Sequence, residues 1–285
     1  MQSKHNSNIL VTGANGQLGQ CLKDVLSPQT LFASRQELDI TNKENVLAYF
    51  KKTSPRLCIN TAAYTQVDMA EEQSDQAYSI NAEALKNLCL ACNELNIPLI
   101  HISTDYVFDG KKDGSYSEND LVNPLGVYGK SKLAGEEIVQ AMANSFLIIR
   151  TSWVYSEYGK NFVKTMLRLA SQKQEIGVVD DQWGGPTYAK DLALVLKELS
   201  EKDLNGLKEV YHYSHEGKIS WAQFAEEIFK QKEIKTRVLP IESKDFPSKS
   251  PRPSNSSFSK DKIKKDFGIN IPDWKEGLSR CLERL

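Results

Sequence analysis

A tyrosine and a lysine four residues apart are the side chains best suited to acid–base chemistry in this chain. Tyr128 and Lys132 are this pair, and none of the other tyrosines has a lysine at the same offset. Four residues are about one helical turn, so both side chains would share one helix face. A free phenol has a pKa of about 10, and a nearby ammonium lowers it. The pair predicts a proton donor for a carbonyl oxygen that gains negative charge, although a solvated lysine beside a half-buried tyrosine has the same spacing.

Three glycines follow the first apolar run of the chain. Residues 8–12 predict a buried strand, and residues 17–26 have a helical pattern. Gly13 would allow a tight turn, Gly16 a close approach to a pyrophosphate, and Gly19 the packing of helix on sheet. The unpaired N–H groups of the helix would then face the phosphates. There is no Gly-Lys-Ser/Thr ending of the kind that binds nucleoside triphosphates, so the spacing G-x-x-G-x-x-G favours a dinucleotide.

The end of the second expected strand, residues 30–33, indicates which dinucleotide is bound. An acidic residue at this position usually binds the ribose hydroxyls in folds that select NAD. Here Ser34 and Arg35 follow the strand, and an arginine can pair with the 2′-phosphate of NADP. Asp39 could serve the adenine or ribose instead. We therefore expect NADPH as the cofactor, with NADH possible.

The glycine turn and the Tyr-x-x-x-Lys pair together resemble the extended short-chain dehydrogenase/reductase superfamily. Further motifs resemble one of its families, dTDP-4-dehydrorhamnose reductase, and run in that family's order from about residue 9 to about residue 275. They are the segments 60–68 (NTAAYTQVD), 103–110 (STDYVFDG), 150–155 (RTSWVY), 181–187 (DQWGGPT) and 251–256 (PRPSNS). The resemblance implies NAD(P)H-dependent reduction of the 4-keto group of dTDP-4-dehydro-L-rhamnose to give dTDP-L-rhamnose.

The resemblance also implies a role for each matching residue. Tyr128 would be the catalytic general acid, Lys132 would bind the nicotinamide ribose and lower the pKa of Tyr128, and Thr104 would hydrogen-bond the substrate carbonyl. Trp153 would lie against the sugar nucleotide, as a flat apolar ring can. The expected cofactor-binding residues are Gly13, Asn15, Gly16, Gln17, Leu18, Gly19, Arg35, Asp39, Ile40, Ala62, Ala63, Tyr64, Tyr128 and Lys132. The expected substrate-binding residues are Thr65, Val67, Thr104, Asp105, Tyr128, Trp153, Asn161 and Arg252.

Three of these residues have a plainer interpretation when the resemblance is set aside. Thr104 follows an expected strand and could cap a turn, as threonine often does. Trp153 could belong to the core. Arg252 lies in the proline-rich segment 247–254, which could be only a rigid surface loop.

The alternation of strands and helices predicts the fold. Residues 1–150 are expected to form a dinucleotide-binding domain, an α/β Rossmann-like doubly wound parallel sheet with helices on both faces. Residues 151–285 are expected to form mainly a smaller substrate-binding domain, with some elements returning to the main sheet. Strands are expected near 8–12, 30–33, 57–60, 98–103, 146–150, 177–179 and 209–213, and helices near 17–26, 43–52, 75–96, 127–143, 161–172, 189–199 and 221–230.

Composition excludes several classes of partner. A net charge of −1 over 285 residues, with the basic residues mostly scattered, does not favour nucleic-acid binding. No run reaches the roughly 18 apolar residues of a membrane span, and residues 1–7 are polar and lack the core of a signal peptide. The five cysteines are widely spread and predict buried, reduced thiols. We therefore expect a cytoplasmic protein with a small-molecule nucleotide-sugar substrate.

The resemblance breaks down at the metal site that many members of the family use to bridge a dimer. Acidic residues hold that metal, whereas this chain has Asn15 and Lys190 at the positions that correspond. Neither side chain is an acidic oxygen ligand of the kind that Mg²⁺ prefers, and Lys190 would repel a cation. We therefore expect no metal, and a monomer or a metal-independent homodimer.

Two other functions remain open. A nucleotide-sugar epimerase or dehydratase has the same fold, but dehydratases usually carry two adjacent acids after the active-site threonine, and here Thr104 is followed by Asp105 and Tyr106. A non-catalytic regulatory subunit of the same fold is the other alternative. The intact set of Thr104, Tyr128 and Lys132 argues against it.

Overall fold

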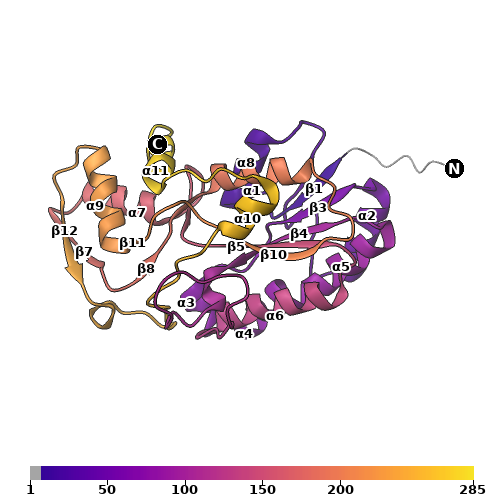
Figure 1. Ribbon diagram of the computed structural model, residues 1–285, viewed down its shortest axis with the longest axis horizontal. Coiled ribbons are helices and arrows are strands. Elements are labelled where there is room, and N and C mark those ends of the chain that lie inside the picture. The colour runs from indigo at the N-terminus through magenta and orange to yellow at the C-terminus, as the bar shows by residue number, and fades with distance from the viewer. Residues whose placement is uncertain (1–7) are drawn as a thin grey trace.

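A six-stranded parallel sheet lies at the centre of the computed structural model, which describes residues 8–285 (Figure 1). All the main-sheet strands expected before residue 150 are present within about one residue of their expected bounds, and the sixth strand returns from the second half of the chain. The expectation about residues 1–7 falls outside the described residues. Across the sheet the strands are β10 (Lys208–Tyr213), β5 (Phe146–Thr151), β4 (Leu99–Thr104), β3 (Leu57–Asn60), β1 (Ile9–Thr12) and β2 (Leu31–Ala33).

The register of the sheet brings the ends of four strands to one edge. Thr12 of β1 pairs with Asn60 of β3, and Asn60 pairs with His101 of β4. Thr104, the last residue of β4, pairs with Thr151, the last residue of β5. The strand order reverses between β1 and β3, so a crevice opens there at the carboxyl edge, where parallel sheets bind ligands.

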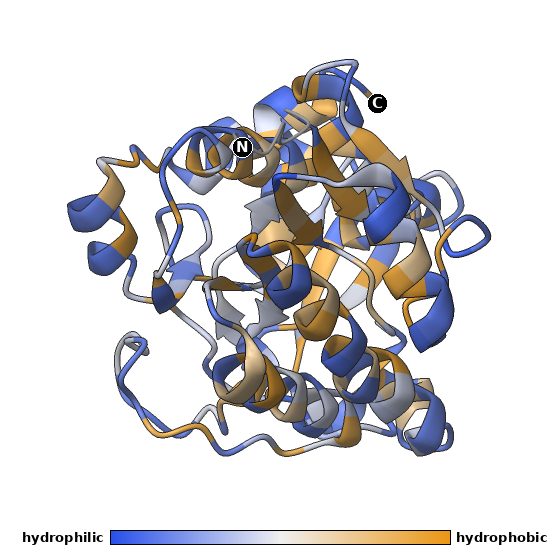
Figure 2. Cartoon of the chain, turned by 90° about the vertical axis from the view of Figure 1, so that its right-hand side faces the viewer, coloured by the Kyte–Doolittle hydropathy of each residue, from blue (hydrophilic) through white to orange (hydrophobic). Residues whose placement is uncertain are grey.

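Helices cover both faces of the sheet, as expected for a doubly wound fold (Figure 1). Successive strand residues belong to opposite apolar cores: Ile9 and Val11 face one side and Leu10 faces the other. Figure 2 shows the apolar strands enclosed between helices that turn their polar sides outward. This double burial explains why the strands read as continuous apolar runs. One face carries α1 (Gln17–Val25), α8 (Ala189–Ser200) and α10 (Asp261–Phe267), and the other carries α2 (Lys43–Thr53), α5 (Ala84–Leu95) and α6 (Val127–Met142).

The helix expected over residues 75–96 is interrupted. It begins as α4 (Ser74–Tyr78), widens into the π-helical turn η1 (Ser79–Glu83), and continues as α5. Within η1, the side chain of Asn81 accepts a hydrogen bond from the backbone N–H of Tyr64 at 2.8 Å and donates to its carbonyl at 3.1 Å. A π turn often marks a functional position, and this one holds the loop that follows β3.

The second half of the chain builds its own apolar cluster beside the sheet. The helices and strands expected there are present, and the capping box of Ser220 and Gln223 opens α9. A strand that the sequence did not predict pairs with β7; it contains Pro240 and is mostly exposed, so it has no alternation to detect. The elements are β6 (Val154–Tyr155), α7 (Phe162–Ala170), β7 (Glu175–Val179), β8 (Trp183–Gly184), β9 (Thr187–Tyr188), β11 (Ile219–Ser220), α9 (Trp221–Gln231), β12 (Arg237–Ile241) and α11 (Trp274–Leu282).

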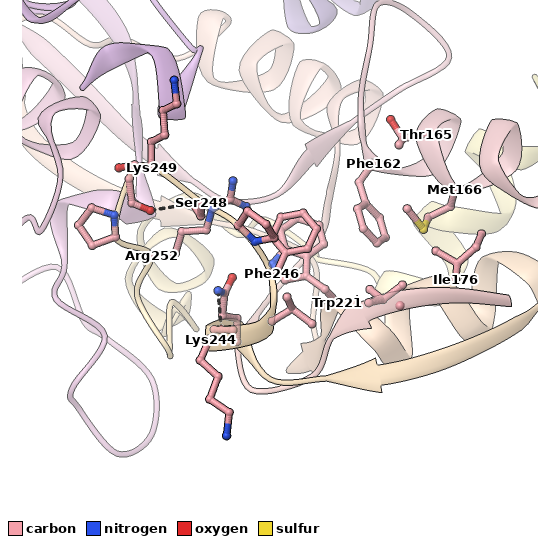
Figure 3. Close-up of a pocket in the computed structure, with 18 of the residues that line it drawn as sticks. Phe162, Thr165, Met166, Ile176, Trp221, Lys244, Phe246, Ser248, Lys249 and Arg252 are labelled. Atoms are coloured by element: carbon pink, nitrogen blue, oxygen red, sulfur yellow. Dashed lines mark hydrogen bonds between the residues drawn. The ribbon is translucent and has the colours of Figure 1, made fainter. Parts of the chain in front are cut away.

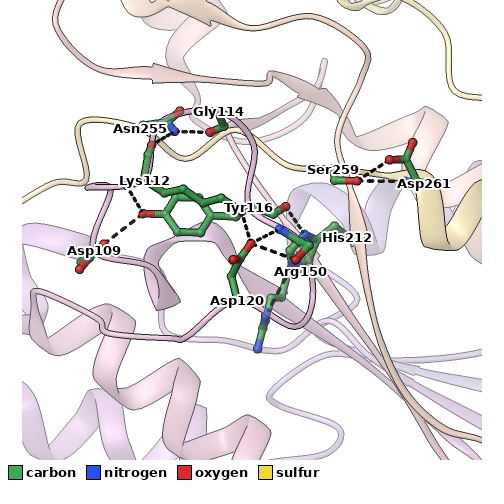
Figure 4. Close-up of polar contacts among 11 residues, drawn as sticks. Asp109, Lys112, Gly114, Tyr116, Asp120, Arg150, His212, Asn255, Ser259 and Asp261 are labelled. Atoms are coloured by element: carbon green, nitrogen blue, oxygen red, sulfur yellow. Dashed lines mark hydrogen bonds and ion pairs between the residues drawn. The ribbon is translucent and has the colours of Figure 1, made fainter.

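A buried polar network ties the segment after β4 to the far strands of the sheet (Figure 4). His212 of β10 contacts the carbonyl of Tyr116 through Nδ1 at 3.2 Å and lies 3.4 Å from Nη1 of Arg150 through Nε2. Arg150 donates two hydrogen bonds to Oε2 of Glu136, at 2.7 and 3.1 Å. A buried guanidinium needs such a paired carboxylate, so this network locks α6 against β5.

Two expectations from composition can be compared with the described residues. The five cysteines are all buried there, and none forms a disulfide. Across residues 8–285, no helix has both the length and the apolar character needed to cross a membrane.

Candidate active site

The glycine turn is built where only glycine fits. Gly13 has a φ of +72°, and a Cβ on it would lie 2.5 Å from the backbone nitrogen of Ala62. A Cβ on Gly19 would lie 2.5 Å from the carbonyl oxygen of Gly13. Gly16 is the N-cap of α1 and supplies no side chain to its first N–H groups. These groups therefore stay free to bind an anion at the helix terminus.

A cavity of about 600 Å³ opens beside this turn. Eight of the expected cofactor-binding residues line it: Gly13, Asn15, Gly16, Arg35, Asp39, Ile40, Ala62 and Ala63. Gln17, Leu18, Gly19 and Tyr64 lie next to it in the chain without lining it. Residues that sequence reasoning missed also line the cavity: Ser34, Gln36, Leu38, Thr41, Thr61 and Ile80. These six missed residues follow β2 or β3 or belong to η1, so only the packing of these elements brings them together.

A positive group projects into solvent at the end of β2. The Arg35 side chain is 69% exposed, and its Nε lies 3.7 Å from a carboxylate oxygen of Asp39. Asp39 in turn accepts hydrogen bonds from the hydroxyl and the N–H of Thr41, at 2.7 and 3.0 Å. The hydrogen bond from the Thr41 hydroxyl is the main reason why the pKa of Asp39 lies below its usual value. Asp39 therefore stays ionised beside Arg35, whose side chain remains mostly exposed.

Thr104 and Tyr128 meet at the carboxyl end of β4, as the resemblance implies. Thr104 ends the strand, and Tyr128 is the second residue of α6. Burial raises the pKa of Tyr128 to about 12, and hydrogen bonding with Thr104 acts in the opposite direction. The Thr104 hydroxyl also donates to Oδ1 of Asp105 at 3.1 Å. The two hydroxyl groups thus form a pair that can face one carbonyl oxygen.

Lys132 lies one turn after Tyr128 in α6, as the spacing predicts. Its side chain is buried, and Nζ donates to the carbonyl oxygen of Ile102 at 2.7 Å. Burial lowers the pKa of Lys132 to about 8, although Glu136 acts in the opposite direction. The pKa of Tyr128 is nevertheless raised, because desolvation of the phenol dominates, and the expected lowering by Lys132 stays a prediction.

Two residues that sequence reasoning missed hold the start of α6. Its N-cap, Gly126, has no side chain, and Oε1 of Glu71 accepts the hydrogen bond from the N–H of Val127 at 2.9 Å. Asn81 donates to the hydroxyl of Ser131 at 3.0 Å. A glycine N-cap signals that an outside acceptor is needed, but the sequence does not say which residue supplies it.

A second cavity, of about 980 Å³, lies between the apolar cluster of the second half of the chain and the loop 243–252 (Figure 3). Its apolar wall includes Phe162, Met166, Ile176, Trp221 and Phe246, and its polar rim includes Lys244, Lys249 and Arg252. Arg252 pairs with Asp68 at 3.2 Å and has a buried Nε that makes no hydrogen bond in the structure. Arg252 lines this cavity, and a contact between Arg252 and substrate stays a prediction.

Trp153 does not line this cavity itself, but one face of its ring is covered by Trp221, which does. Its ring stacks on Trp221, with centroids 3.5 Å apart and planes at 8°. The backbone of Trp153 has a φ of +48°, a conformation that costs a non-glycine residue energy and that often occurs at functional sites. A Cβ on Gly184 would lie 2.7 Å from the Trp153 ring. Trp153 is thus held rigidly, and a ligand could contact only the face or edge that Trp221 leaves free.

The remaining expected substrate-binding residues lie in different settings. Thr65 is exposed and Val67 is half-buried, both after β3, and Asp105 is buried after β4. Asn161 caps α7 through Oδ1, and its Nδ2 donates to Oε1 of Gln17 at 2.9 Å and to the carbonyl of Ser156 at 2.7 Å. The polar atoms of Asn161 are therefore used within the protein, and a contact between this residue and substrate stays a prediction.

The segment around Lys190 carries no cluster of metal ligands. Lys190 forms an ion pair with Asp24 at 3.0 Å. Within residues 8–285, no group of three or more His, Cys, Asp or Glu side chains is arranged to hold a metal ion. The absence of an interface metal and the oligomeric state both stay predictions.

A doubly wound sheet, a glycine turn at its crevice and a Thr–Tyr–Lys set at the neighbouring strand end define an oxidoreductase of the short-chain dehydrogenase/reductase class. Comparison with known proteins narrows this class. A family model described as "RmlD substrate binding domain" matches residues 7–285. A dTDP-4-dehydrorhamnose reductase of Aggregatibacter actinomycetemcomitans is 43% identical over 95% of this chain and 97% of its own. The spore coat polysaccharide biosynthesis protein SpsK of Bacillus subtilis is 39% identical over 97% of each chain.

Solved structures agree with these relatives. The dTDP-4-dehydrorhamnose reductase of Bacillus anthracis, in complex with NADP, superposes with a TM-score of 0.94 at 39% identity, over 98% of this chain and 100% of that one. An orthologue from Clostridium acetobutylicum superposes with a TM-score of 0.92 at 41% identity, over 97% and 98%. The chain belongs to the dTDP-4-dehydrorhamnose reductase family, which confirms the resemblance seen in its motifs.

Proposed function

We propose that this chain catalyses the NADPH-dependent reduction of the 4-keto group of dTDP-4-dehydro-L-rhamnose, which yields dTDP-L-rhamnose. The observation that carries the proposal is the meeting of Thr104 and Tyr128 at the end of β4, in a chain that also has a cavity at its glycine turn. The names of the relatives and the NADP complex of the Bacillus anthracis structure support the same reaction.

The first cavity suits the adenosine half of a dinucleotide. The free N–H groups at the start of α1 would bind the pyrophosphate, and Arg35 would pair with a 2′-phosphate. Asp39 and Ile40 would face the adenosine, and Ala62, Ala63 and Tyr64 would line the path toward the nicotinamide. Tyr128 and Lys132 would complete the cofactor site at its reactive end. When bound, NADPH supplies the hydride, and the protein supplies position and the proton.

The proton would come from Tyr128. Thr104 would donate a hydrogen bond to the substrate carbonyl, which polarises it and fixes its distance from the phenol. Oη of Tyr128 would then give its proton to that oxygen as negative charge develops there. Lys132 would stabilise the phenolate that remains, since an ammonium nearby favours the charged form of a phenol.

The second cavity suits the nucleotide part of the substrate. Its apolar wall can receive a pyrimidine ring, and the cations Lys244, Lys249 and Arg252 at its rim match a diphosphate. Trp153 would contact the sugar nucleotide with the part of its ring that Trp221 leaves free. The further contacts proposed for the substrate are those of Thr65, Val67, Asp105 and Asn161.

Loss of NADPH absorbance in the presence of dTDP-4-dehydro-L-rhamnose tests the proposal. Tyr128→Phe should lower kcat by about 100- to 10,000-fold, the usual worth of a general acid. Tyr158→Phe is the matched control, because the Tyr158 hydroxyl contacts Asp24 away from the site, and it should keep full activity. Turnover by Tyr128→Phe at the rate of the unmodified chain would refute the assignment. Running the assay with uridine analogues and with NADH determines the preferred nucleotide and cofactor.

The compartment and the assembly are inferred from the sequence. We infer a cytoplasmic protein that is a monomer or a metal-independent homodimer, because Lys190 and Asn15 do not provide a metal bridge. Light scattering with and without EDTA measures the mass. A dimer that dissociates on addition of the chelator would contradict this inference.

A further inference from the structure

A row of buried polar side chains crosses the sheet behind the proposed proton donor. It starts at Thr12 and continues through Asn60 and His101 to Lys132, and each of the four side chains is at most 2% exposed. The hydroxyl of Thr12 donates to Oδ1 of Asn60 at 2.5 Å. Nδ2 of Asn60 lies 2.9 Å from Nδ1 of His101, and Nε2 of His101 lies 3.4 Å from Nζ of Lys132. At this depth each donor needs a protein acceptor.

Asn60 decides which nitrogen of His101 carries the proton. The backbone N–H of Ala62 donates to Oδ1 of Asn60 at 3.3 Å, so the amide nitrogen must point the other way, at His101. An amide nitrogen only donates, so Nδ1 of His101 has to accept and cannot carry a hydrogen. The neutral imidazole therefore carries its hydrogen on Nε2. Burial and the nearby Lys132 hold the pKa of His101 well below its ordinary value, which keeps the ring neutral.

His101 thus presents an N–H group to Lys132. An ammonium has donors only, so a charged Lys132 and Nε2–H of His101 face each other as two donors. Their separation of 3.4 Å is longer than a normal hydrogen bond. A neutral amine has a lone pair and can accept from Nε2–H. The contact therefore favours the neutral form of Lys132 over the charged form.

Among the described residues, two other groups act on Lys132. The carbonyl oxygen of Ile102 accepts from Nζ at 2.7 Å and suits either form. Glu136, on the same helix, favours the ammonium, but it is already paired with Arg150 at 2.7 Å. The pKa of Lys132, lowered to about 8 by burial, is in keeping with a group that can release its proton near neutral pH.

We propose that His101 is a positioning residue whose Nε2–H, oriented by Asn60, weakens the hold of Lys132 on its proton. The inference rests on the proposed reduction, in which Tyr128 becomes a phenolate and must regain a proton. In that step the Nζ–H bond of Lys132 breaks and the O–H bond of Tyr128 forms, so ammonium and phenolate become amine and phenol. The amine lone pair then accepts from His101. The row is not a route to solvent, because the amide of Asn60 cannot pass a proton on.

Two variants of similar volume separate this role from a packing role. The amide of His101→Gln can accept from Asn60 and still present an N–H group to Lys132, whereas His101→Met presents none. The readout is the pH at which kcat/KM of NADPH oxidation falls to half on the alkaline side. His101→Gln should keep the wild-type midpoint, and His101→Met should raise it by about one pH unit. An unchanged midpoint in His101→Met, or an equal shift in both variants, would overturn the proposal.

A second measurement does not depend on turnover. The unmodified chain labelled with ¹⁵N-histidine shows the tautomer of each imidazole by NMR, and the signal missing from His101→Gln identifies His101. The expected result is a neutral ring protonated at Nε2 from about pH 6 upward, whereas an ordinary histidine, with a pKa of about 6.5, is mostly charged at pH 6. A ring protonated at Nδ1, or a charged ring, would refute the inference. Failure of the reductase assay with this tautomer intact would count only against the proposed function.

Discussion

Oε1 of Glu71 accepts the hydrogen bond of the first N–H group of α6, that of Val127, at 2.9 Å. The same oxygen accepts from the hydroxyl of Ser250 at 2.8 Å. One carboxylate thus holds together the helix that carries Tyr128 and the loop that carries Arg252. The proposed proton donor and the proposed substrate-binding arginine therefore depend on a shared anchor that touches neither ligand.

Replacement of this anchor should cost both stability and activity. Glu71→Ala should lower the free energy of unfolding by about 1 kcal/mol, as loss of a helix cap does, and should lower kcat because the first turn of α6 frays beside Tyr128. Glu71→Gln keeps an oxygen acceptor and should lose less stability and less activity than Glu71→Ala. Glu72→Ala removes only an exposed contact with Lys249 and is the control. Urea unfolding and the NADPH assay measure the effects, and equal results for the alanine variants at 71 and 72 would contradict the anchoring role.

Arg35 should set the preference between the two cofactors. Its guanidinium is exposed at the cavity beside the glycine turn, where it would bond a 2′-phosphate. A hydrogen bond to a charged group is worth about 1.5–3 kcal/mol, so Arg35→Ala should raise KM for NADPH about 10- to 150-fold. KM for NADH should barely change, and this serves as the internal control. An equal increase in KM for NADPH and for NADH would show that Arg35 does not recognise the 2′-phosphate.

Lys132 should lower the stability of the fold at neutral pH. Its pKa falls from the model-compound value of 10.5 to about 8 because the ammonium is buried. The unfolded chain therefore binds more protons between these two values, so this group's contribution to stability rises as pH increases through that window. The shift corresponds to roughly 3 kcal/mol.

Lys132→Met removes this titration and provides the test. At pH 7 the variant should be the more stable protein by up to about 3 kcal/mol, less the lost hydrogen bond to Ile102, although it should be inactive. Its advantage should shrink on going to pH 10, as the unmodified chain loses the buried charge. Urea unfolding at both values gives the difference. If the stability advantage of Lys132→Met grew with pH instead, the pKa of Lys132 would be raised by folding and not lowered.

The buried pair of Glu136 and Arg150 should be far more costly to break than to replace. Arg150→Met leaves a carboxylate of 0% exposure without its partner, so the cost should be about 3–5 kcal/mol. Replacing both residues by methionine removes both charges, and the loss should be smaller than for the single variant. A double-mutant cycle measured by urea unfolding gives the coupling. A double loss equal to the sum of the single losses would exclude such coupling.

Local pattern was enough to predict most of the scaffold. The strands of the central sheet are short apolar runs, and β1, β3 and β5 are buried on both faces. Each of these runs therefore predicts a strand without information from the rest of the chain. The glycine turn was equally readable, because its backbone requires residues without a Cβ at defined spacings. β12 escaped detection because an exposed strand with a proline has no alternation, and the π turn η1 escaped because it depends on the contact of Asn81 with Tyr64.

The sequence by itself determined the spacing of the residues proposed to carry the chemistry: Tyr128 and Lys132 one turn apart, Thr104 at a strand end, and three glycines between strand and helix. These are short-range relations, set by helical and strand periodicity. Only the tertiary structure decided the electrostatics of those residues, because burial is a property of the whole packed chain. Desolvation raises the pKa of Tyr128 and lowers that of Lys132, and partners remote in the sequence, such as Glu71 and His101, come into contact only when the sheet and its helices assemble.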